Sequence, residues 1–281
     1  MMATSAASSP HAISAGCAAP RSGPGRLPIA APTLYIGCAG WSIPVAHAAS
    51  FADGGSHLER YAQVFNAVEV NSSFYRPHLP ATYRRWATAV PAHFRFAVKL
   101  PRTISHQAKL RDCAPLLEAF LVQVDALGEK LGCLLLQLPP SLAYDAAVAQ
   151  PFLARLRRLH PGPVACEPRH ASWFRAGVSR ALRDHRIARV GVDPALCPRA
   201  ALPAGDRSLH YLRLHGAPRT YCDAYPDAVL LRLARQLLRP DRRTAERWCI
   251  FDNTALGHAT ADALALMQFT QAWSSTPSAA G

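Results

Sequence analysis

The sequence predicts an α/β protein, a (β/α)8 barrel in which eight parallel strands close into a cylinder with helices outside. Eight short apolar runs cross the chain, and amphipathic segments fill most of the gaps between them. The eight units occupy roughly 240 residues, which is the usual size of such a barrel. An open doubly wound sheet is the alternative, but no Gly-x-Gly-x-x-Gly follows the first run to favour a dinucleotide fold.

The elements follow from their hydrophobic periodicity. Strands are short apolar runs, and they are predicted at residues 34–39, 67–71, 94–99, 133–138, 164–167, 188–193, 209–214 and 248–252. Helices repeat apolar residues every three or four positions, and they are predicted at 57–65, 82–89, 115–131, 147–159, 174–185, 229–238 and 259–269. In the third helix, Pro115 stands at the first turn, where proline is favoured.

The barrel is predicted to be a single domain over residues 33–272. Residues 1–32 are rich in Ala, Ser, Gly and Pro and lack the basic start and apolar centre of a signal peptide, so we expect a disordered extension. Residues 273–281 are expected to form a disordered tail. No apolar run approaches the ~20 residues that span a bilayer, so we expect no membrane association and a cytoplasmic location.

The composition is strongly basic. The net charge is +13, and the 31 basic residues include only three lysines, Lys99, Lys109 and Lys130. Abundant arginine beside alanine and proline is typical of a GC-rich genome, but it also fits attraction to phosphate or nucleic acid. The eight cysteines form no Cys-x-x-Cys pair, which indicates buried thiols in a reducing compartment rather than disulfides.

Polar residues end several of the predicted strands. Side chains alternate across a strand, so Glu69 and Asn71 share one face of the second strand, opposite Val68 and Val70. Further strand ends carry Lys99, Gln137, Glu167, Arg169, Asp193, Arg213, His215, Asp252 and Asn253. Because buried charges need partners and barrel active sites lie at the C-terminal strand ends, these residues predict one polar site there.

An ordered series of motifs resembles the family called domain of unknown function 72, or YecE-like. The motifs cover nearly everything after residue 33 and read IGCAGWS at 36–42, FNAVEVNSSFY at 65–75, FAVK at 96–99, QLPP at 137–140, EPRHASW at 167–173, YLRLHG at 211–216 and FDNT at 251–254. The resemblance implies a TIM-type barrel, in agreement with the strand count. It implies no reaction, because the family has no established activity.

Six residues are candidates for catalysis. A carboxyl group of Glu69, Glu167 or Asp252 would transfer a proton if burial raised its pKa, with His215 or His170 assisting. The amine of Lys99 would bind an anion or form a Schiff base with a carbonyl. The structural alternative is a layer of ion pairs, in which Glu69 pairs with Lys99 and Glu167 with an arginine.

The predicted ligand is an anionic small molecule. Arg169 and Arg213, together with Lys99, would bind its phosphate or carboxylate group, because guanidinium groups bind such anions in a bidentate manner. Aromatic residues beyond the strand ends would either stack on the ligand or pack beneath the loops; they are Trp41, Tyr75 and Trp173. The remaining polar candidates for ligand contact are Asn71, His106, Gln137, Asp193 and Asn253.

These residues favour an enzyme of the hydrolase or lyase type, monomeric by default and without a cofactor. A second hypothesis is a nucleic-acid-binding protein or metal-dependent phosphodiesterase like the apurinic endonuclease barrels, with His106, His170 and His215 among its metal ligands. No metal ligand is assigned, because Lys99 and its neighbouring arginines would repel a cation. A third hypothesis is a barrel that senses a metabolite without catalysis.

Overall fold

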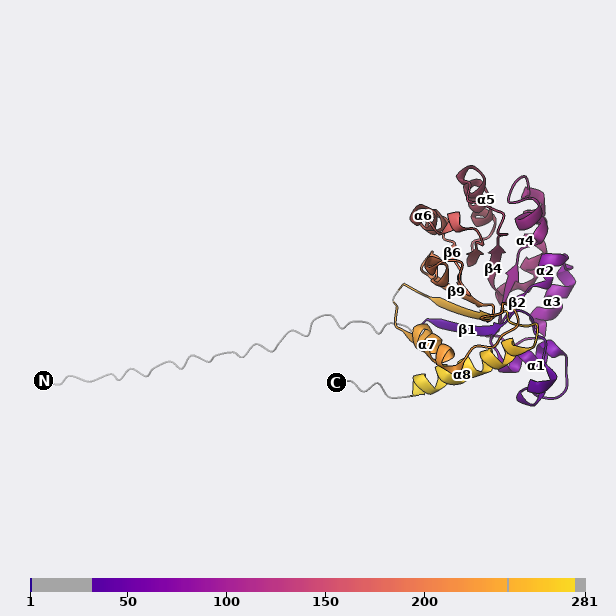
Figure 1. Ribbon diagram of the computed structural model, residues 1–281, viewed down its shortest axis with the longest axis vertical. Coiled ribbons are helices and arrows are strands. Elements are labelled where there is room, and N and C mark those ends of the chain that lie inside the picture. Colours follow the sequence, from indigo (N-terminus) through magenta and orange to yellow (C-terminus); the bar gives the residue numbers. More distant parts are fainter. Residues whose placement is uncertain (2–31, 242, 276–281) are drawn as a thin grey trace. The chain divides into compact units, whose positions relative to one another are not determined.

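The predicted barrel is confirmed, with its strands in the predicted chain order (Figure 1). The computed structural model describes residues 1, 32–241 and 243–275, so most of the predicted extension and residues 276–281 of the predicted tail lie outside the described residues. The strands are β1 (Thr33–Cys38), β2 (Ala67–Val70), β3 (Arg95–Lys99), β4 (Leu131–Gln137), β5 (Val164–Glu167), β6 (Ala188–Arg189), β7 (Gly191–Asp193), β8 (Ala204–Gly205), β9 (Leu209–Leu214) and β10 (Glu246–Phe251).

The sheet returns on itself through the sixth predicted strand, which is divided into two pieces. The strand order is β7-β9-β10-β1-β2-β3-β4-β5-β6-β8, and every pair is parallel except β6 with β8. β6 pairs with β5, whereas β7 pairs with β9, and Val190 joins the two pieces. The amide of Val190 donates to the carbonyl of Cys166 at 2.8 Å, which continues the ladder across the division.

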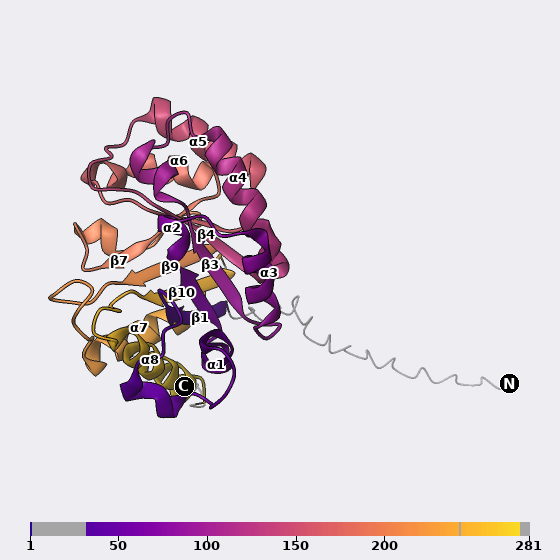
Figure 2. The ribbon, with the colours of Figure 1, turned by 90° about the vertical axis from the view of Figure 1, so that its right-hand side faces the viewer.

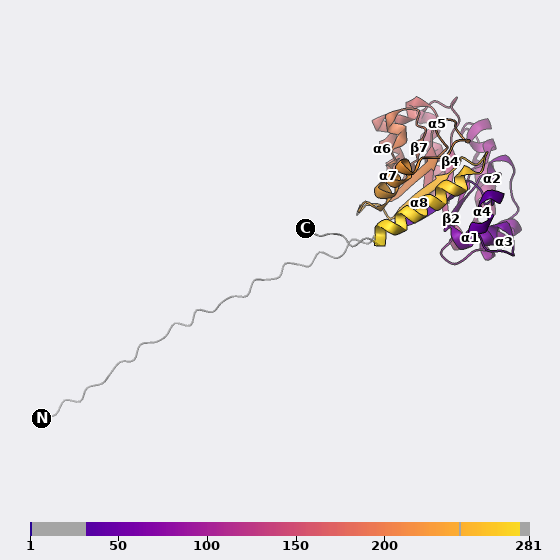
Figure 3. The ribbon, with the colours of Figure 1, turned by 60° about the horizontal axis from the view of Figure 1, so that its bottom comes forward.

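The helices surround the strands, and Figure 3 shows α8 along the outside of the barrel. Helix α8 contacts β1 and β10. They are α1 (His57–Val64), α2 (Ser72–Tyr75), α3 (Pro80–Thr88), α4 (Ala114–Val124), α5 (Ala146–Leu159), α6 (Ala176–Asp184), α7 (Asp227–Leu238) and α8 (His258–Ser275). The short helix α2 was not predicted. In the described part of the chain, no helix is both long and apolar enough to cross a membrane.

Two predicted helix boundaries need correction. The helix predicted at 115–131 ends at Val124 and continues as a 3-10 helix, η3 (Asp125–Lys130), because Gly128 adopts a φ of 54° that interrupts the α-helical ladder. The last helix extends through Ser275, so residues 273–275 belong to α8 although the sequence assigned them to the tail.

One crossover of the barrel lacks an α-helix. Between β7 and β9 the described chain forms a 3-10 helix, η5 (Pro198–Ala201), and the two-residue strand β8, which pairs antiparallel with β6. Helix α6, which precedes β6, packs against β8. The flank of the barrel beside α6 is therefore covered by a loop rather than by a second helix.

The core has two layers, one between strands and helices and one inside the barrel. The inner layer is uneven in size: β2, β3 and β5 contribute Ala67, Ala97 and Ala165, whereas the opposite side carries large aromatic rings. The rings of Tyr211 and Trp248 stack with centroids 5.7 Å apart and an interplanar angle of 9°. Small residues on one wall therefore make room for aromatic residues on the other, and together they fill the lower barrel.

The close approach of β1 and β2 depends on a glycine. A Cβ atom at Gly37 would lie 1.9 Å from the carbonyl oxygen of Ala67, a backbone atom that cannot move without separating the strands. Replacing Gly37 by alanine is therefore expected to lower the free energy of unfolding by about 2 kcal/mol, measured by urea denaturation. The control is Gly177→Ala in α6, where a Cβ meets nothing within 4 Å and stability should not fall. Equal stability of the two variants would contradict this account.

Candidate functional site

The inward positions of the barrel change from apolar to polar at the C-terminal strand ends. Side-chain alternation places Glu69 two residues after Ala67, and Glu167 two residues after Ala165, on the inner face. By the same rule Arg213 follows Tyr211 on β9, which lies beside β10 and β7 (Figure 2). The polar residues thus form a layer directly above the apolar filling of the barrel, where barrel enzymes place their active sites.

Arg213 is the centre of this layer. Its side chain is fully buried, and its Nη2 donates to Glu69 Oε1 at 2.7 Å and to Asp252 Oδ2 at 2.8 Å. Its Nε donates to Glu69 Oε2 at 3.0 Å, and its Nη1 to Glu167 Oε2 at 2.5 Å. All three nitrogens are therefore engaged by carboxylates from β2 and β5 and from the residue after β10. Arg213 organises the site, and its guanidinium is not free to hold a ligand.

Glu167 connects this centre to the barrel mouth. Its Oε1 accepts from Arg169 Nε and, at 3.1 Å, from Gln137 Nε2. The side chain of Arg169 is 28% exposed, whereas that of Glu167 is fully buried. The ion-pair alternative considered from the sequence holds for Glu167, which pairs with Arg169 and Arg213. It does not hold for Glu69, which pairs with Arg213 and not with Lys99.

Two carboxyl groups of the layer, those of Glu167 and Asp252, have lowered pKa values, which favours their ionised forms. Burial raises the pKa of Glu167, but the charge of Arg213 and a hydrogen bond from His215 outweigh it and hold the pKa well below its ordinary value. The same opposition of burial against Arg213 and His215 lowers the pKa of Asp252. The condition stated for acid–base catalysis by these two carboxyl groups, a pKa raised by burial, is not met, because an opposite charge in contact outweighs desolvation.

His215 is placed to exchange a proton at Nε2. Its Nδ1 lies 3.0 Å from Asp252 Oδ2 and must donate, because a carboxylate only accepts. Its Nε2 lies 3.1 Å from Arg169 Nη2, which requires an unprotonated nitrogen, and 3.5 Å from Glu167 Oε1, which requires a protonated one. Burial lowers the pKa of His215, but the hydrogen bonds to Asp252 and Glu167 raise it overall, so both protonation states have a partner in place.

Lys99 is a buried cation of the site that forms no ion pair with the carboxylates. The residue is 7% exposed, and its Nζ lies 4.1 Å from the centroid of the Phe74 ring. Within the described residues, no carboxylate forms an ion pair with Nζ, since Glu69, Glu167 and Asp252 point to Arg213 instead. Burial and the charge of Arg213 lower the pKa of Lys99, against the opposing effect of the three carboxylates. The amine therefore lies near the carboxylates without a direct ion pair.

The other predicted polar residues differ in their surroundings. Asn71 follows β2, and its Oδ1 is buried without a hydrogen-bond partner among the described residues. His106 packs edge-on against Phe74, and burial together with the charge of Lys99 lowers its pKa. Asn253 and Asp193 hold loops instead: Asn253 Nδ2 donates to Asp262 at 2.7 Å, and Asp193 Oδ1 accepts from Tyr225 at 3.0 Å.

The predicted aromatic contacts and His170 are not part of the polar layer. Trp173 is 1% exposed and donates from Nε1 to the carbonyl of Leu142, so it packs beneath a loop and offers no face to a ligand. Trp41 packs edge-on against Trp86, and Tyr75 is 71% exposed. His170 begins a 3-10 helix, η4 (Ala171–Phe174), where its Nδ1 accepts from the amide of Ser172.

Two residues of the site were missed by the sequence analysis. Tyr211 donates to Glu69 Oε2 at 2.9 Å, and its position two residues before Arg213 on β9 is the alternation signal that would have found it. Phe74 supports the amine of Lys99 from α2, a helix too short for its periodicity to be read from sequence.

A metal would find few free ligands in this layer. The described residues contain no group of three or more His, Cys, Asp and Glu side chains arranged to hold a metal ion. The carboxylates of Glu69, Glu167 and Asp252 already accept hydrogen bonds from Arg213, and the charge of Lys99 adds repulsion toward a cation.

The comparisons with known proteins agree with this architecture. Two curated relatives, both called UPF0759 protein YecE, come from Escherichia coli K12 (34% identity over 168 residues, 57% of this chain) and from Escherichia coli O157:H7 (33% over 166 residues, 58% of this chain). The chain spans about 59% and 58% of their lengths.

Solved structures extend the similarity over most of the barrel. A DUF72 family protein from Enterococcus faecalis V583 matches with a TM-score of 0.72 at 22% identity, covering 85% of this chain and 96% of that one. One from Thermotoga maritima MSB8 matches with a TM-score of 0.69 at 25% identity, covering 86% and 99%. The model of the family described as protein of unknown function DUF72 matches residues 35–280, and the chain therefore belongs to the DUF72 family.

Proposed function

We propose that the barrel mouth is the active site of an enzyme that binds an anionic small molecule and transfers a proton on it, as a hydrolase or a lyase does. The observation that carries this proposal is the buried side chain of Lys99, whose ammonium makes no direct ion pair with a described residue. A phosphate or carboxylate of a ligand would give this ammonium the charge-assisted hydrogen bond that the described carboxylates give to Arg213 instead. The exposed part of Arg169 offers a second cationic contact beside it.

The proton transfer is assigned to His215. Its Nε2 stands between Arg169 and Glu167, and each neighbour suits one protonation state. Glu167 and Asp252 act through His215: as ionised carboxylates they orient its ring and raise its pKa. The lowered pKa of Lys99 also suits an amine that accepts a proton or attacks a carbonyl carbon.

The binding step is tested with Lys99→Met. Inorganic phosphate and succinate serve as probes in isothermal titration calorimetry with the full chain, after a thermal-shift survey of phosphate- and carboxylate-bearing small molecules. A charge-assisted contact contributes about 1.5–3 kcal/mol, so the variant should bind the best ligand about tenfold to hundredfold more weakly. Lys109→Met is the control, because Lys109 is exposed.

The survey also separates the alternatives. Equal affinity of Lys99→Met and the wild type would refute the anion site at the mouth. Saturable binding without conversion of the ligand, followed by NMR of the mixture, would indicate a metabolite sensor. Tight DNA or RNA binding that weakens steeply with salt, in place of small-molecule binding, would favour the nucleic-acid hypothesis.

A further inference from the structure

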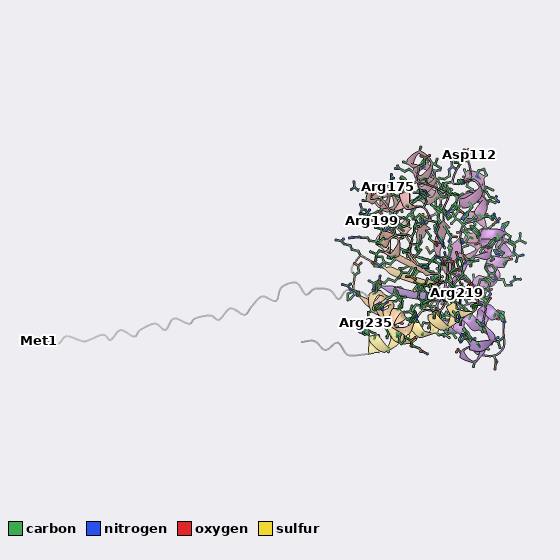
Figure 4. The ribbon with its side chains drawn as sticks, in the orientation of Figure 1. Met1, Asp112, Arg175, Arg199, Arg219 and Arg235 are labelled. Carbon is green, nitrogen blue, oxygen red and sulfur yellow. The ribbon has the colours of Figure 1, made fainter. Side chains whose placement is uncertain are left out.

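A second cationic cavity lies on the flank of the barrel, away from the mouth. Its volume is about 740 Å3, and it lies between α6, the loop that contains η5 and β8, and the segments that lead into β9 and β10. This is the flank where the crossover from β7 to β9 has no α-helix to cover the strands. Arg199 lies at the edge of the protein on the α6 side (Figure 4). The cavity therefore results from the shortened crossover.

The charge of its lining is one-sided. Six arginines face two aspartates, Asp206 and Asp241; the arginines are Arg180, Arg183, Arg189, Arg199, Arg207 and Arg243. None of the six forms an ion pair with a described residue. Both aspartates accept hydrogen bonds from nearby hydroxyl groups instead of pairing with these arginines: Asp206 accepts from Ser208 and Asp241 from Thr244. The lining therefore carries uncompensated positive charge.

Arg189 shows that the charge is built into the fold. Arg189 lies on β6 and is 3% exposed. Its Nη1 donates to Ser179 Oγ at 2.8 Å, and its Nη2 donates to the carbonyl of Arg199 at 2.8 Å. The ring of Phe174 lies 5.1 Å from its guanidinium. Its Nε is buried and has no hydrogen-bond partner within the described residues. A buried guanidinium without a carboxylate is costly unless an anion approaches it.

We propose that this flank cavity, independent of the barrel mouth, binds a small molecule that carries two or more phosphate groups. Several guanidinium groups converging on one cavity suit the spread charge and multiple acceptor oxygens of linked phosphates. The volume falls within the ~300–1,000 Å3 range of small-molecule sites, and a cavity favours a compact ligand over an extended nucleic-acid backbone. The site is distinct from the mouth because it shares no residue with the Arg213 network.

The test uses tripolyphosphate as the probe, with the full chain in isothermal titration calorimetry at about 0.15 M ionic strength to screen non-specific attraction. The test variant is the double substitution Arg180→Gln and Arg183→Gln on α6. The matched control is Arg84→Gln and Arg85→Gln on α3, which removes the same charge; Arg85 and Arg183 each lie in the last turn of their helix. Circular dichroism checks that each variant is folded. Lys99→Met serves as the variant of the mouth.

The expected result is saturable binding that weakens at least tenfold in the α6 variant and stays unchanged in the α3 control and in Lys99→Met. Equal weakening in both double variants would show general charge attraction and overturn the proposal. Loss in Lys99→Met alone would place the probe at the mouth and overturn it as well, as would absence of binding to the wild type. Tighter binding of a single-stranded oligonucleotide that displaces tripolyphosphate would replace the small ligand by nucleic acid.

Discussion

Replacing Arg213 by methionine is expected to lower the free energy of unfolding by about 3–5 kcal/mol at pH 7, the cost of removing one partner from a buried ion pair. The substitution leaves the carboxylates of Glu69, Glu167 and Asp252 close together in the barrel without the cation that joins them. Urea denaturation at equilibrium measures the loss. Arg84→Met on the exposed face of α3 is the control, with an expected change within about 0.5 kcal/mol.

The same variant should recover part of this difference in acid. Without Arg213, burial raises the pKa of the enclosed carboxyl groups above their unfolded values, so the folded variant takes up protons and gains stability as the pH falls. The wild type changes in the opposite direction, because Arg213 and His215 hold the pKa values of Glu167 and Asp252 low against burial. A stability gap that is as wide at pH 4 as at pH 7 would contradict the network.

The second large effect is expected from Glu167→Gln. The substitution keeps the shape of the side chain but removes the charge that accepts from both Arg169 and Arg213, at a cost of about 2–3 kcal/mol at pH 7. The control is Glu118→Gln, whose carboxylate pairs with Arg155 at 3.0 Å on the surface and contributes less than about 1 kcal/mol.

The pH dependence of this effect has a definite sign. Burial raises the pKa of Glu167, but Arg213 outweighs burial and holds this pKa below its value in the unfolded chain. The stabilisation that ionised Glu167 contributes is therefore complete above the unfolded-state pKa, and it is lost as the pH falls through the folded-state pKa. The difference between wild type and Glu167→Gln should therefore shrink on acidification. NMR titration of His215 adds a second readout, because loss of the Glu167 hydrogen bond should lower the pKa of that imidazole. An unchanged His215 pKa would show that the two side chains do not interact in solution.

The fold and the composition of the polar layer follow from sequence because both rest on local patterns. Alternation within short apolar runs identifies which residue of each strand points inward, and parallel strands bring Glu69, Glu167 and Arg213 to the same end of the barrel. The partners of each charge do not follow from these patterns. The ion-pair alternative considered from sequence joined Glu69 to Lys99 on the adjacent strand, whereas Glu69 pairs with Arg213 across the barrel, which depends on the spacing of strands far apart in sequence.

Loop residues were harder to place for a related reason. For Trp173, the sequence left open whether the ring stacks on a ligand or packs beneath a loop, and the path of a 3-10 helix carries it into the core, where its Nε1 donates to the carbonyl of Leu142. The flank cavity left no signal either. Its arginines lie on α6, β6 and η5 and in the loops before β9 and β10, and no local pattern distinguishes them from the many other arginines of the chain.

The aromatic residues that fill the lower barrel determine by which route a ligand could enter and leave the proposed site. Tyr35, Tyr211 and Trp248 fill the interior beneath the charged layer, with the rings of Tyr35 and Trp248 4.6 Å apart. A ligand at the proposed site beside Lys99 would therefore have no exit through this packed interior and would leave by the barrel mouth through which it entered. Substrate and product of the proposed reaction would share that opening, so accumulated product would compete directly with fresh substrate for entry.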